Sequence, residues 1–155
     1  MAAAGGRHLI LRTSWVYAPR GRNFMLTMLR LAAERDELRV VDDQRGAPTP
    51  SLQIARATLE LLDLQREHSG VYHATAAGET TWFGFAGAIF DARKRKLGEA
   101  FRMPKLVPIR TADYPTPARR PKNSVLSNAK LENVFGARLP DWREGLEDAL
   151  GALGG

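Results

Sequence analysis

Short apolar runs alternate along the chain with segments whose apolar residues repeat at helical spacing, and this alternation is its strongest constraint on the fold. Residues 8–15, 37–41, 70–75 and 105–109 carry the apolar runs. Such runs, bounded by turn-forming residues, indicate buried strands. Strands that alternate with helices are typical of the α/β class. We therefore predict an α/β fold, with residues 1–155 forming one domain.

Side chains that can cap helices stand at the start of three helical segments. Asn23, Ser51 and Thr81 each precede apolar residues at helical spacing. Their side-chain oxygens can accept a hydrogen bond from an N–H group of the first turn. Gly98 suits the end of the third segment, since glycine adopts the left-handed backbone common there. In the second segment the repeating residues are Leu52, Ala55, Leu59 and Leu62.

Composition excludes several classes of protein. The net charge of +6, from 23 Lys and Arg against 17 Asp and Glu, favours an anionic partner. The basic residues are spread along the chain without a binding motif, so we predict no nucleic-acid partner. No apolar run approaches the roughly 20 residues that span a bilayer, and no signal peptide is apparent, so we predict no membrane association.

Metal and thiol chemistry is also disfavoured. The chain has no cysteine, which removes disulfides and thiol nucleophiles and fits a reducing cytoplasm, where we place the protein. His8, His68 and His73 lack metal-ligand spacing with one another or with carboxylates. We therefore predict no metal site.

The stretch RTSWVYAPRGRNF carries more polar and aromatic groups than a plain connection needs. Trp15 can offer a flat apolar face to a sugar ring, and Thr13 and Ser14 carry hydroxyls that can bind a ligand. Asn23 stands at a helix start, where backbone N–H groups favour phosphate. The alternative is that Trp15 and Tyr17 are packing residues and that Asn23 is only a cap.

Two further segments have a comparable character. In DQRGAPT, Gly46 and Pro48 impose a turn with hydrogen-bonding groups at its rim; an ordinary connecting loop is the alternative. In YPTPARRPKNS, three prolines stiffen an extended segment, and Arg119 and Arg120 can make charge-assisted bonds to phosphate. A solvated surface strap is the alternative there.

The four segments RTSWVYAPRGRNF, VVDDQRGAPT, GVYHATAAGETTW and YPTPARRPKNSVLS, in this order, resemble the dTDP-4-dehydrorhamnose reductases, a family of extended short-chain dehydrogenases/reductases. The resemblance covers about residues 8–150. It implies a Rossmann-like parent fold that reduces the C4 ketone of dTDP-4-dehydro-L-rhamnose with NADPH or NADH.

The resemblance also implies roles for single residues. Trp15 would lie against the deoxysugar, with Thr13 and Ser14 in the same pocket and Asn23 near the diphosphate. The dTDP portion of the substrate would be held by Gln44, Thr49, Arg120, Asn123 and Ser124.

The chain lacks the family's sequence motifs for hydride transfer. No G-x-G-x-x-G or G-x-x-G-x-x-G run follows a strand, and the family's Tyr-x-x-x-Lys pair is absent. The residues found four positions after Tyr17, Tyr72 and Tyr114 are Gly21, Ala76 and Ala118. The chain therefore looks like the C-terminal, substrate-binding half of such an enzyme, without catalytic or cofactor-binding residues of its own.

This interpretation carries expectations about partners. We expect a dTDP-sugar as ligand, an inactive chain when alone, and either a complementing N-terminal half or self-association, because a parent sheet that loses strands exposes an edge. A non-catalytic nucleotide-sugar-binding or assembly subunit is the alternative from another class. Another nucleotide-sugar reductase or epimerase of the same superfamily is a further alternative.

Overall fold

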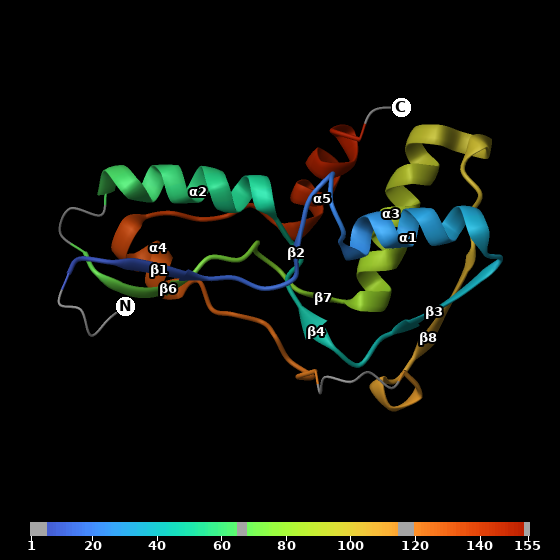
Figure 1. The fold of residues 1–155 in the computed structure, drawn as a ribbon, viewed down its shortest axis with the longest axis horizontal. Coiled ribbons are helices and arrows are strands. Elements are labelled where there is room, and N and C mark those ends of the chain that lie inside the picture. The colour runs from blue at the N-terminus through green and yellow to red at the C-terminus, as the bar shows by residue number, and fades with distance from the viewer. Residues whose placement is uncertain (1–5, 65–67, 115–119, 154–155) are drawn as a thin grey trace.

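The computed structural model describes residues 6–64, 68–114 and 120–153 and shows an elongated molecule (Figure 1). One end contains α2, α4, β1 and β6, and the other contains α1, α3, β3 and β8. The elements in chain order are β1 (Leu9–Arg12), β2 (Val16–Tyr17), α1 (Phe24–Glu34), β3 (Glu37–Val41), β4 (Arg45–Gly46), β5 (Thr49–Pro50), α2 (Ser51–Leu64), β6 (Gly70–His73), β7 (Thr80–Thr81), α3 (Trp82–Leu97), η3 (Gly98–Ala100), β8 (Lys105–Ile109), η4 (Thr111–Asp113), α4 (Ala129–Phe135) and α5 (Trp142–Gly151).

The described strands form pairs that join distant parts of the chain. β1 runs parallel to β6, with Leu9 opposite Gly70, and β3 runs parallel to β8, with Glu37 opposite Lys105. β2 and β5 form a short parallel pair, whereas β4 and β7 are antiparallel. Parallel strands need crossover connections, which the helices supply here. The predicted mixed α/β class is therefore confirmed.

Local signals placed two helix starts and one helix end correctly, whereas Ser51, predicted as a cap, is the first residue of α2. The Oδ1 atom of Asn23 accepts a hydrogen bond from the N–H of Leu26 at 3.1 Å, and α1 begins at the next residue. The hydroxyl of Thr81 accepts from the N–H of Gly84 at 3.0 Å at the start of α3. That helix ends at Gly98, whose φ of +55° suits glycine. These caps form as predicted because each depends on neighbours within one turn.

The first apolar run differs from its prediction as a single strand over residues 8–15. β1 ends at Arg12, and Trp15 has a φ of +50°, in the left-handed region that bulky residues rarely adopt. The left-handed residue separates β1 from β2, so the run pairs first with β6 and then with β5. Residues 42–50, predicted as a loop, likewise contain the short strands β4 and β5.

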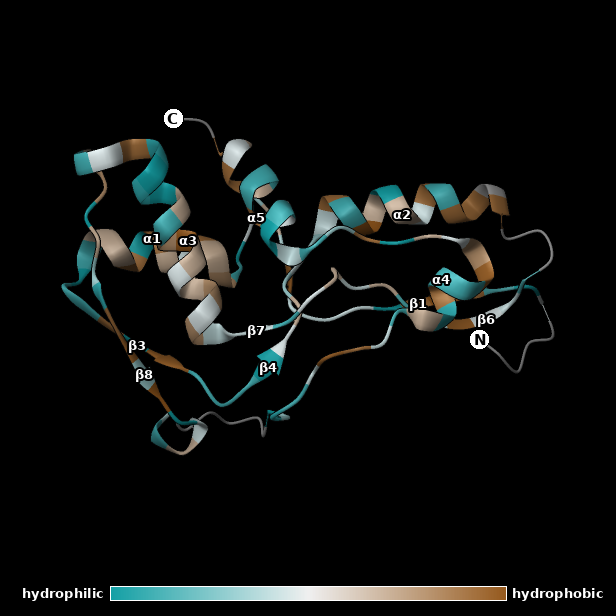
Figure 2. Cartoon of the chain, turned by 180° about the vertical axis from the view of Figure 1, so that it is seen from behind, coloured by the Kyte–Doolittle hydropathy of each residue, from teal (hydrophilic) through white to brown (hydrophobic). Residues whose placement is uncertain are grey.

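The larger hydrophobic core lies where α1, α3 and α5 meet. Phe85 and Ile89 of α3 and Trp142 of α5 are almost fully buried in it. The Phe85 ring lies 5.2 Å from Tyr17 and 6.0 Å, edge to face, from Trp142. Figure 2 shows hydrophobic residues on β3 and β8, which α3 covers. Burial of each such large side chain contributes roughly 1.5–3 kcal/mol to folding.

The smaller core lies under α2 and α4. Ala57 and Leu61 of α2 are buried with Tyr72 of β6 and Leu131 of α4. The predicted leucine stripe is on the opposite side of α2, where Leu52, Leu59 and Leu62 are 52%, 65% and 48% exposed. α2 therefore presents two apolar faces and buries only one of them within the described residues.

Thr49 ties the centre of the molecule together. Its side chain is fully buried, and its hydroxyl accepts from the N–H of Ala76 at 3.1 Å and donates to the carbonyl of Ala47 at 3.0 Å. Thr49 lies in β5, and Ala76 lies beyond β6. One hydroxyl thus satisfies two buried backbone groups from different parts of the chain.

Replacing Thr49 with Val keeps the shape and removes both hydrogen bonds. We expect Thr49→Val to lower the free energy of unfolding by about 1–3 kcal/mol, because a buried N–H then has no partner. Thr58→Val is the matched control, since the Thr58 hydroxyl only returns to the carbonyl of Ile54 within α2. We expect it to cost less than about 0.5 kcal/mol. Equal urea midpoints for the two variants would contradict the role of Thr49.

Candidate functional site

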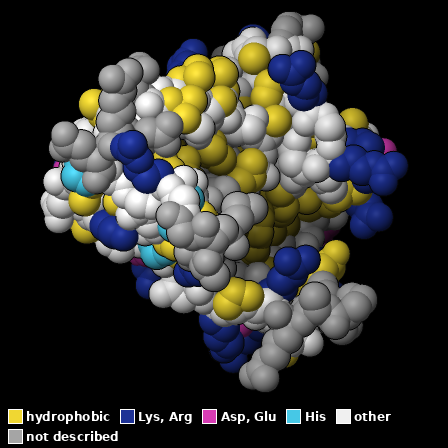
Figure 3. Space-filling model, turned by 60° about the vertical axis from the view of Figure 1, so that its left-hand side comes forward, with side chains coloured by type: hydrophobic (Ala, Val, Ile, Leu, Met, Phe, Trp, Pro, Cys, Tyr) yellow, Lys and Arg dark blue, Asp and Glu magenta, His cyan; other side chains and the backbone are white. Residues whose placement is uncertain are grey.

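A pocket of about 980 Å³ lies beside α1, the start of α3 and β3. Apolar side chains, among them Phe24, Leu31 and Val40, form much of its wall. Charged and polar groups of Arg39 and Tyr114 also line it. Figure 3 shows a hollowed face with a hydrophobic floor and with Lys and Arg side chains around it. An apolar pocket with a few polar groups is typical of a small-molecule site.

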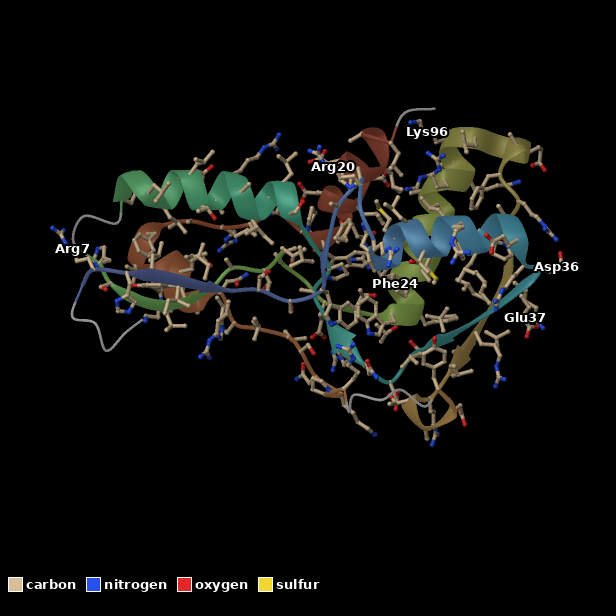
Figure 4. The ribbon with its side chains drawn as sticks, viewed as in Figure 1. Arg7, Arg20, Phe24, Asp36, Glu37 and Lys96 are labelled. Atoms are coloured by element: carbon tan, nitrogen blue, oxygen red, sulfur yellow. The ribbon has the colours of Figure 1, made fainter. Side chains whose placement is uncertain are left out.

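Two tryptophans stack at this pocket. The ring centroids of Trp15 and Trp82 are 3.6 Å apart, and the ring planes differ by 8°. Phe24, labelled at the start of α1 in Figure 4, packs on Trp82 with a centroid separation of 4.6 Å. The three rings come from the β1–β2 connection, the first residue of α1 and the first residue of α3. Three element ends therefore converge on one aromatic cluster.

Gly46 lies directly against the Trp15 indole. A Cβ atom on Gly46 would stand 2.3 Å from Cε2 of Trp15 and 2.6 and 2.7 Å from Nε1 and Cδ2. Cε2 is a ring-fusion atom, so this spacing places the Cβ position over the ring face and not at its edge. Trp82 stacks 3.6 Å from Trp15, yet none of the three atoms nearest to that Cβ position belongs to Trp82. Trp82 therefore lies on the opposite face, and the indole of Trp15 is held between Trp82 and the Gly46 backbone. Any side chain larger than that of glycine would displace the ring.

A chain of hydrogen bonds orients Trp82. Its Nε1–H donates to Oε1 of Gln44 at 3.2 Å, and Nε2 of Gln44 donates to the hydroxyl of Thr111 at 3.0 Å. The Thr111 hydroxyl in turn donates to Oδ1 of Asp43 at 2.6 Å. The indole N–H of Trp82 can only donate, so the Gln44 atom that faces it must be the amide oxygen. The Gln44 amide nitrogen then faces Thr111.

Asp43 anchors that chain as a carboxylate. The hydrogen bond from the Thr111 hydroxyl is the largest cause that lowers the pKa of Asp43 below its usual value. Partial desolvation opposes this shift, whereas the Thr111 N–H and Lys122, 3.8 Å away, add to it. The charged form is therefore favoured, and it accepts hydrogen bonds without donating any.

Four of the nine residues predicted to bind substrate line this pocket. Trp15 and Gln44 lie in its aromatic part, and Arg120 and Ser124 come from the extended segment that precedes α4. The N–H of Ser124 donates to the carbonyl of Arg45, which fixes this segment beside β4. The structure thus brings three separate sequence segments to one place, and the binding role of the four residues stays a prediction.

Two other predicted residues use their polar atoms within the fold. Asn23 caps α1 with Oδ1 and donates through Nδ2 to the carbonyl of Ala18 at 2.8 Å. Thr49 is fully buried, with its hydroxyl engaged as described above. Neither residue lines the pocket. Their positions agree with the structural alternative stated for Asn23 and give Thr49 a structural role as well.

The remaining predicted residues lie away from the pocket lining. Thr13 is exposed, and Oγ of Ser14 is buried without a hydrogen-bond partner in the described part of the chain. Oδ1 of Asn123 accepts from the N–H of Val125 at 2.9 Å. Arg119, paired with Arg120 in the sequence, lies outside the described residues.

Some pocket residues were not singled out from the sequence. Phe24 and Trp82 follow the capping residues Asn23 and Thr81 directly, and their pattern predicted only the faces of helices. Arg39 alternates with the buried Leu38 and Val40 in β3. The position of Phe24 and Trp82 in the sequence could have identified them. Each is the first residue of a helix, and pockets often form where helices and strands end.

Neither a cluster of metal-binding side chains nor a membrane-spanning helix occurs in the described part of the chain. Within residues 6–64, 68–114 and 120–153, no group of three or more His, Cys, Asp or Glu side chains is arranged to hold a metal ion. None of the helices there combines the length and apolar character that crossing a bilayer requires.

Known proteins match this chain closely. Residues 1–154 match the family described as the RmlD substrate binding domain. The chain is 51% identical over 151 residues to dTDP-4-dehydrorhamnose reductase of Burkholderia thailandensis, covering 92% of this chain and 51% of that protein. It is 45% identical over 150 residues to the Escherichia coli K12 protein of the same name, covering 95% of this chain and 50% of that protein.

Solved structures of proteins with the same name superpose on this chain. Bacillus anthracis dTDP-4-dehydrorhamnose reductase in complex with NADP superposes with a TM-score of 0.86 at 33% identity, over 97% of this chain and 50% of that one. The Clostridium acetobutylicum reductase superposes with a TM-score of 0.84 at 37% identity, over 94% and 48% of the two chains.

The family resemblance inferred from four ordered sequence segments is therefore confirmed. The chain spans about half the length of the curated relatives it matches. The mixed α/β fold superposes on about half of each of these reductase structures. The chain belongs to the RmlD substrate-binding domain family.

Proposed function

We propose that this chain is the sugar-nucleotide-binding half of an enzyme that reduces the C4 ketone of dTDP-4-dehydro-L-rhamnose to dTDP-L-rhamnose with NADPH or NADH. The observation that carries the proposal is the 980 Å³ pocket that joins an aromatic wall to arginine side chains. The pocket occurs in a chain 51% identical over 151 residues to a protein named as that reductase. Residues 1–155 then act as one substrate-binding domain.

The chemistry of the pocket suits a nucleotide sugar. Aromatic and aliphatic side chains can pack on the flat base and on the apolar faces of the sugars. Arg35, Arg39 and Arg120 line the pocket, and none of them forms an ion pair with another described residue. Their charges are therefore available to the diphosphate, at roughly 1.5–3 kcal/mol for each charge-assisted bond.

The described residues do not fit a nicotinamide dinucleotide in the way that a Rossmann domain binds one. Such domains hold the pyrophosphate on a glycine-rich turn between a strand and a helix. The connection after β1 instead holds Trp15, and neither this connection nor the one after β6 contains a G-x-G-x-x-G run. In this proposal the cofactor and the proton donor come from another polypeptide segment.

Ligand binding is the direct test of the proposal. We expect isothermal titration calorimetry to detect binding of dTDP-L-rhamnose to the purified chain. Trp15→Ala should weaken that binding by about 1–3 kcal/mol, because the ring supplies apolar contact. Trp15→Phe is the control that keeps a ring, and its loss should be smaller. An absence of binding at millimolar ligand would sink the proposal, and equal affinities would return Trp15 to a packing role.

Turnover is a separate question. We expect no oxidation of NADPH when the chain alone meets dTDP-4-dehydro-L-rhamnose, because its sequence lacks Tyr-x-x-x-Lys and the glycine-rich loop. Absorbance at the NADPH band measures this, with the full-length Escherichia coli relative as a positive control. Reduction of the sugar by the chain alone would show that other residues supply the missing chemistry.

We further propose that a complementing N-terminal half docks on β1 and α2. β1 pairs with β6 along one edge, and no other described strand pairs with its second edge. The outer leucines of α2, Leu52, Leu59 and Leu62, are roughly half exposed or more. An open strand edge and an exposed apolar helix face are each typical of a surface that another segment covers. Without that segment, two copies of the chain can cover it for each other.

Charge on that helix face should therefore reduce self-association. We expect the chain to associate at micromolar concentration in sedimentation velocity, and the double variant Leu59→Glu, Leu62→Glu to shift it toward monomer. Met103→Glu is the matched control, because Met103 is 46% exposed and lies outside α2. A wild-type chain that sediments as a monomer, or a double variant that still associates, would contradict a role for the α2 leucines.

A further inference from the structure

The indole of Trp15 has no ring face open to a ligand. One face lies on the Gly46 backbone, and the other lies on Trp82 at a centroid separation of 3.6 Å. That separation is the contact distance of stacked rings, and it leaves no space for a third ring between them. A sugar or base can therefore pack on Trp15 only if one of its two neighbours moves.

Trp15 itself is fixed in place. Its carbonyl accepts from the N–H of Thr49 at 3.2 Å, and Val16, the next residue, pairs with Thr49 in the β2–β5 ladder. The backbone of Gly46 belongs to β4, which pairs with β7, so it cannot retreat without breaking that ladder. The Gly46 backbone thus supports one face of the Trp15 indole, and the β2–β5 ladder fixes the Trp15 backbone.

Trp82 is held more weakly. It is the first residue of α3, and its N-terminal neighbour Thr81 caps the helix, so its side chain can rotate while the helix stays in place. One neutral hydrogen bond, from Nε1–H to Oε1 of Gln44 at 3.2 Å, and the ring contacts with Phe24 and with Trp15 itself hold its indole. Such a hydrogen bond changes an equilibrium by about twofold to tenfold.

We propose that Trp82 is a gate on the pocket. In this structure its indole occupies the face of Trp15 on which, in this proposal, a ring of the nucleotide sugar stacks. Ligand binding moves Trp82 off that face and breaks its hydrogen bond to Gln44. The inference rests on the proposed function. Trp82 lines the pocket, yet it opposes ligand binding as long as it stacks on Trp15 and is hydrogen-bonded to Gln44.

The variant Trp82→Phe tests the gate. It keeps an aromatic ring and removes the Nε1–H that donates to Gln44. We expect dTDP-L-rhamnose to bind this variant about twofold to tenfold more tightly than the wild type, since one neutral hydrogen bond no longer holds the gate closed. Trp142→Phe is the matched control, because Trp142 is buried in the larger core and does not line the pocket. Its affinity should equal that of the wild type.

Indole NMR signals of the ¹⁵N-labelled chain give a second readout. The chain has three tryptophans, and the two Phe variants assign their Nε1–H signals. Saturating ligand should shift the Trp82 signal away from its hydrogen-bonded position and change the ring-current shift of Trp15. The Trp142 signal should stay in place.

The outcomes separate the gate from the proposed function. Binding by the wild type with an unmoved Trp82 signal, or with weaker or unchanged affinity in Trp82→Phe, would overturn the gate and leave the proposed function standing. Binding by Trp82→Phe alone at a given ligand concentration would support both. No binding by any of the chains would overturn the proposed function and the gate with it.

Discussion

The packing of the Trp15 indole on the backbone of Gly46 positions the aromatic wall of the pocket. It requires a glycine in β4 and coincides with the left-handed backbone of Trp15, which separates β1 from β2. A bulky residue in that conformation is uncommon and persists only where its surroundings hold it. Here the β2–β5 ladder on one side and the Trp82 ring on the other provide that support.

Features that depend on near neighbours in sequence were predictable. The caps at Asn23 and Thr81 and the strand Glu37–Val41 formed at the expected positions, because each is specified within a few residues. The packing of Trp15 was not predictable, since its indole lies on Gly46, which is distant in the sequence. The outer leucines of α2 show the same limit of sequence-based prediction. A helical repeat of leucines predicts an apolar helix face but does not show which segment, if any, covers that face.

The candidate site was predictable as segments more than as residues. All four quoted segments meet at one pocket, through Trp15, Gln44, Trp82 and Arg120. Asn23 and Thr49, however, use their polar atoms for a helix cap and for a buried bridge. A polar side chain near a site can bind a ligand or form hydrogen bonds with the backbone. Only the packed structure shows which side chains already form such backbone hydrogen bonds.

The two hydrophobic cores give the ends of the molecule separate sources of stability. The smaller core, under α2 and α4, contains fewer buried residues than the core around α3, and α2 leaves its outer leucines exposed. Ends with separate cores can open independently, and the less well packed end opens at lower free energy. A segment that binds only the closed form of that end stabilises it by mass action. The folding of one end of this chain would then vary with the concentration of its partner, so that assembly and folding become a single equilibrium.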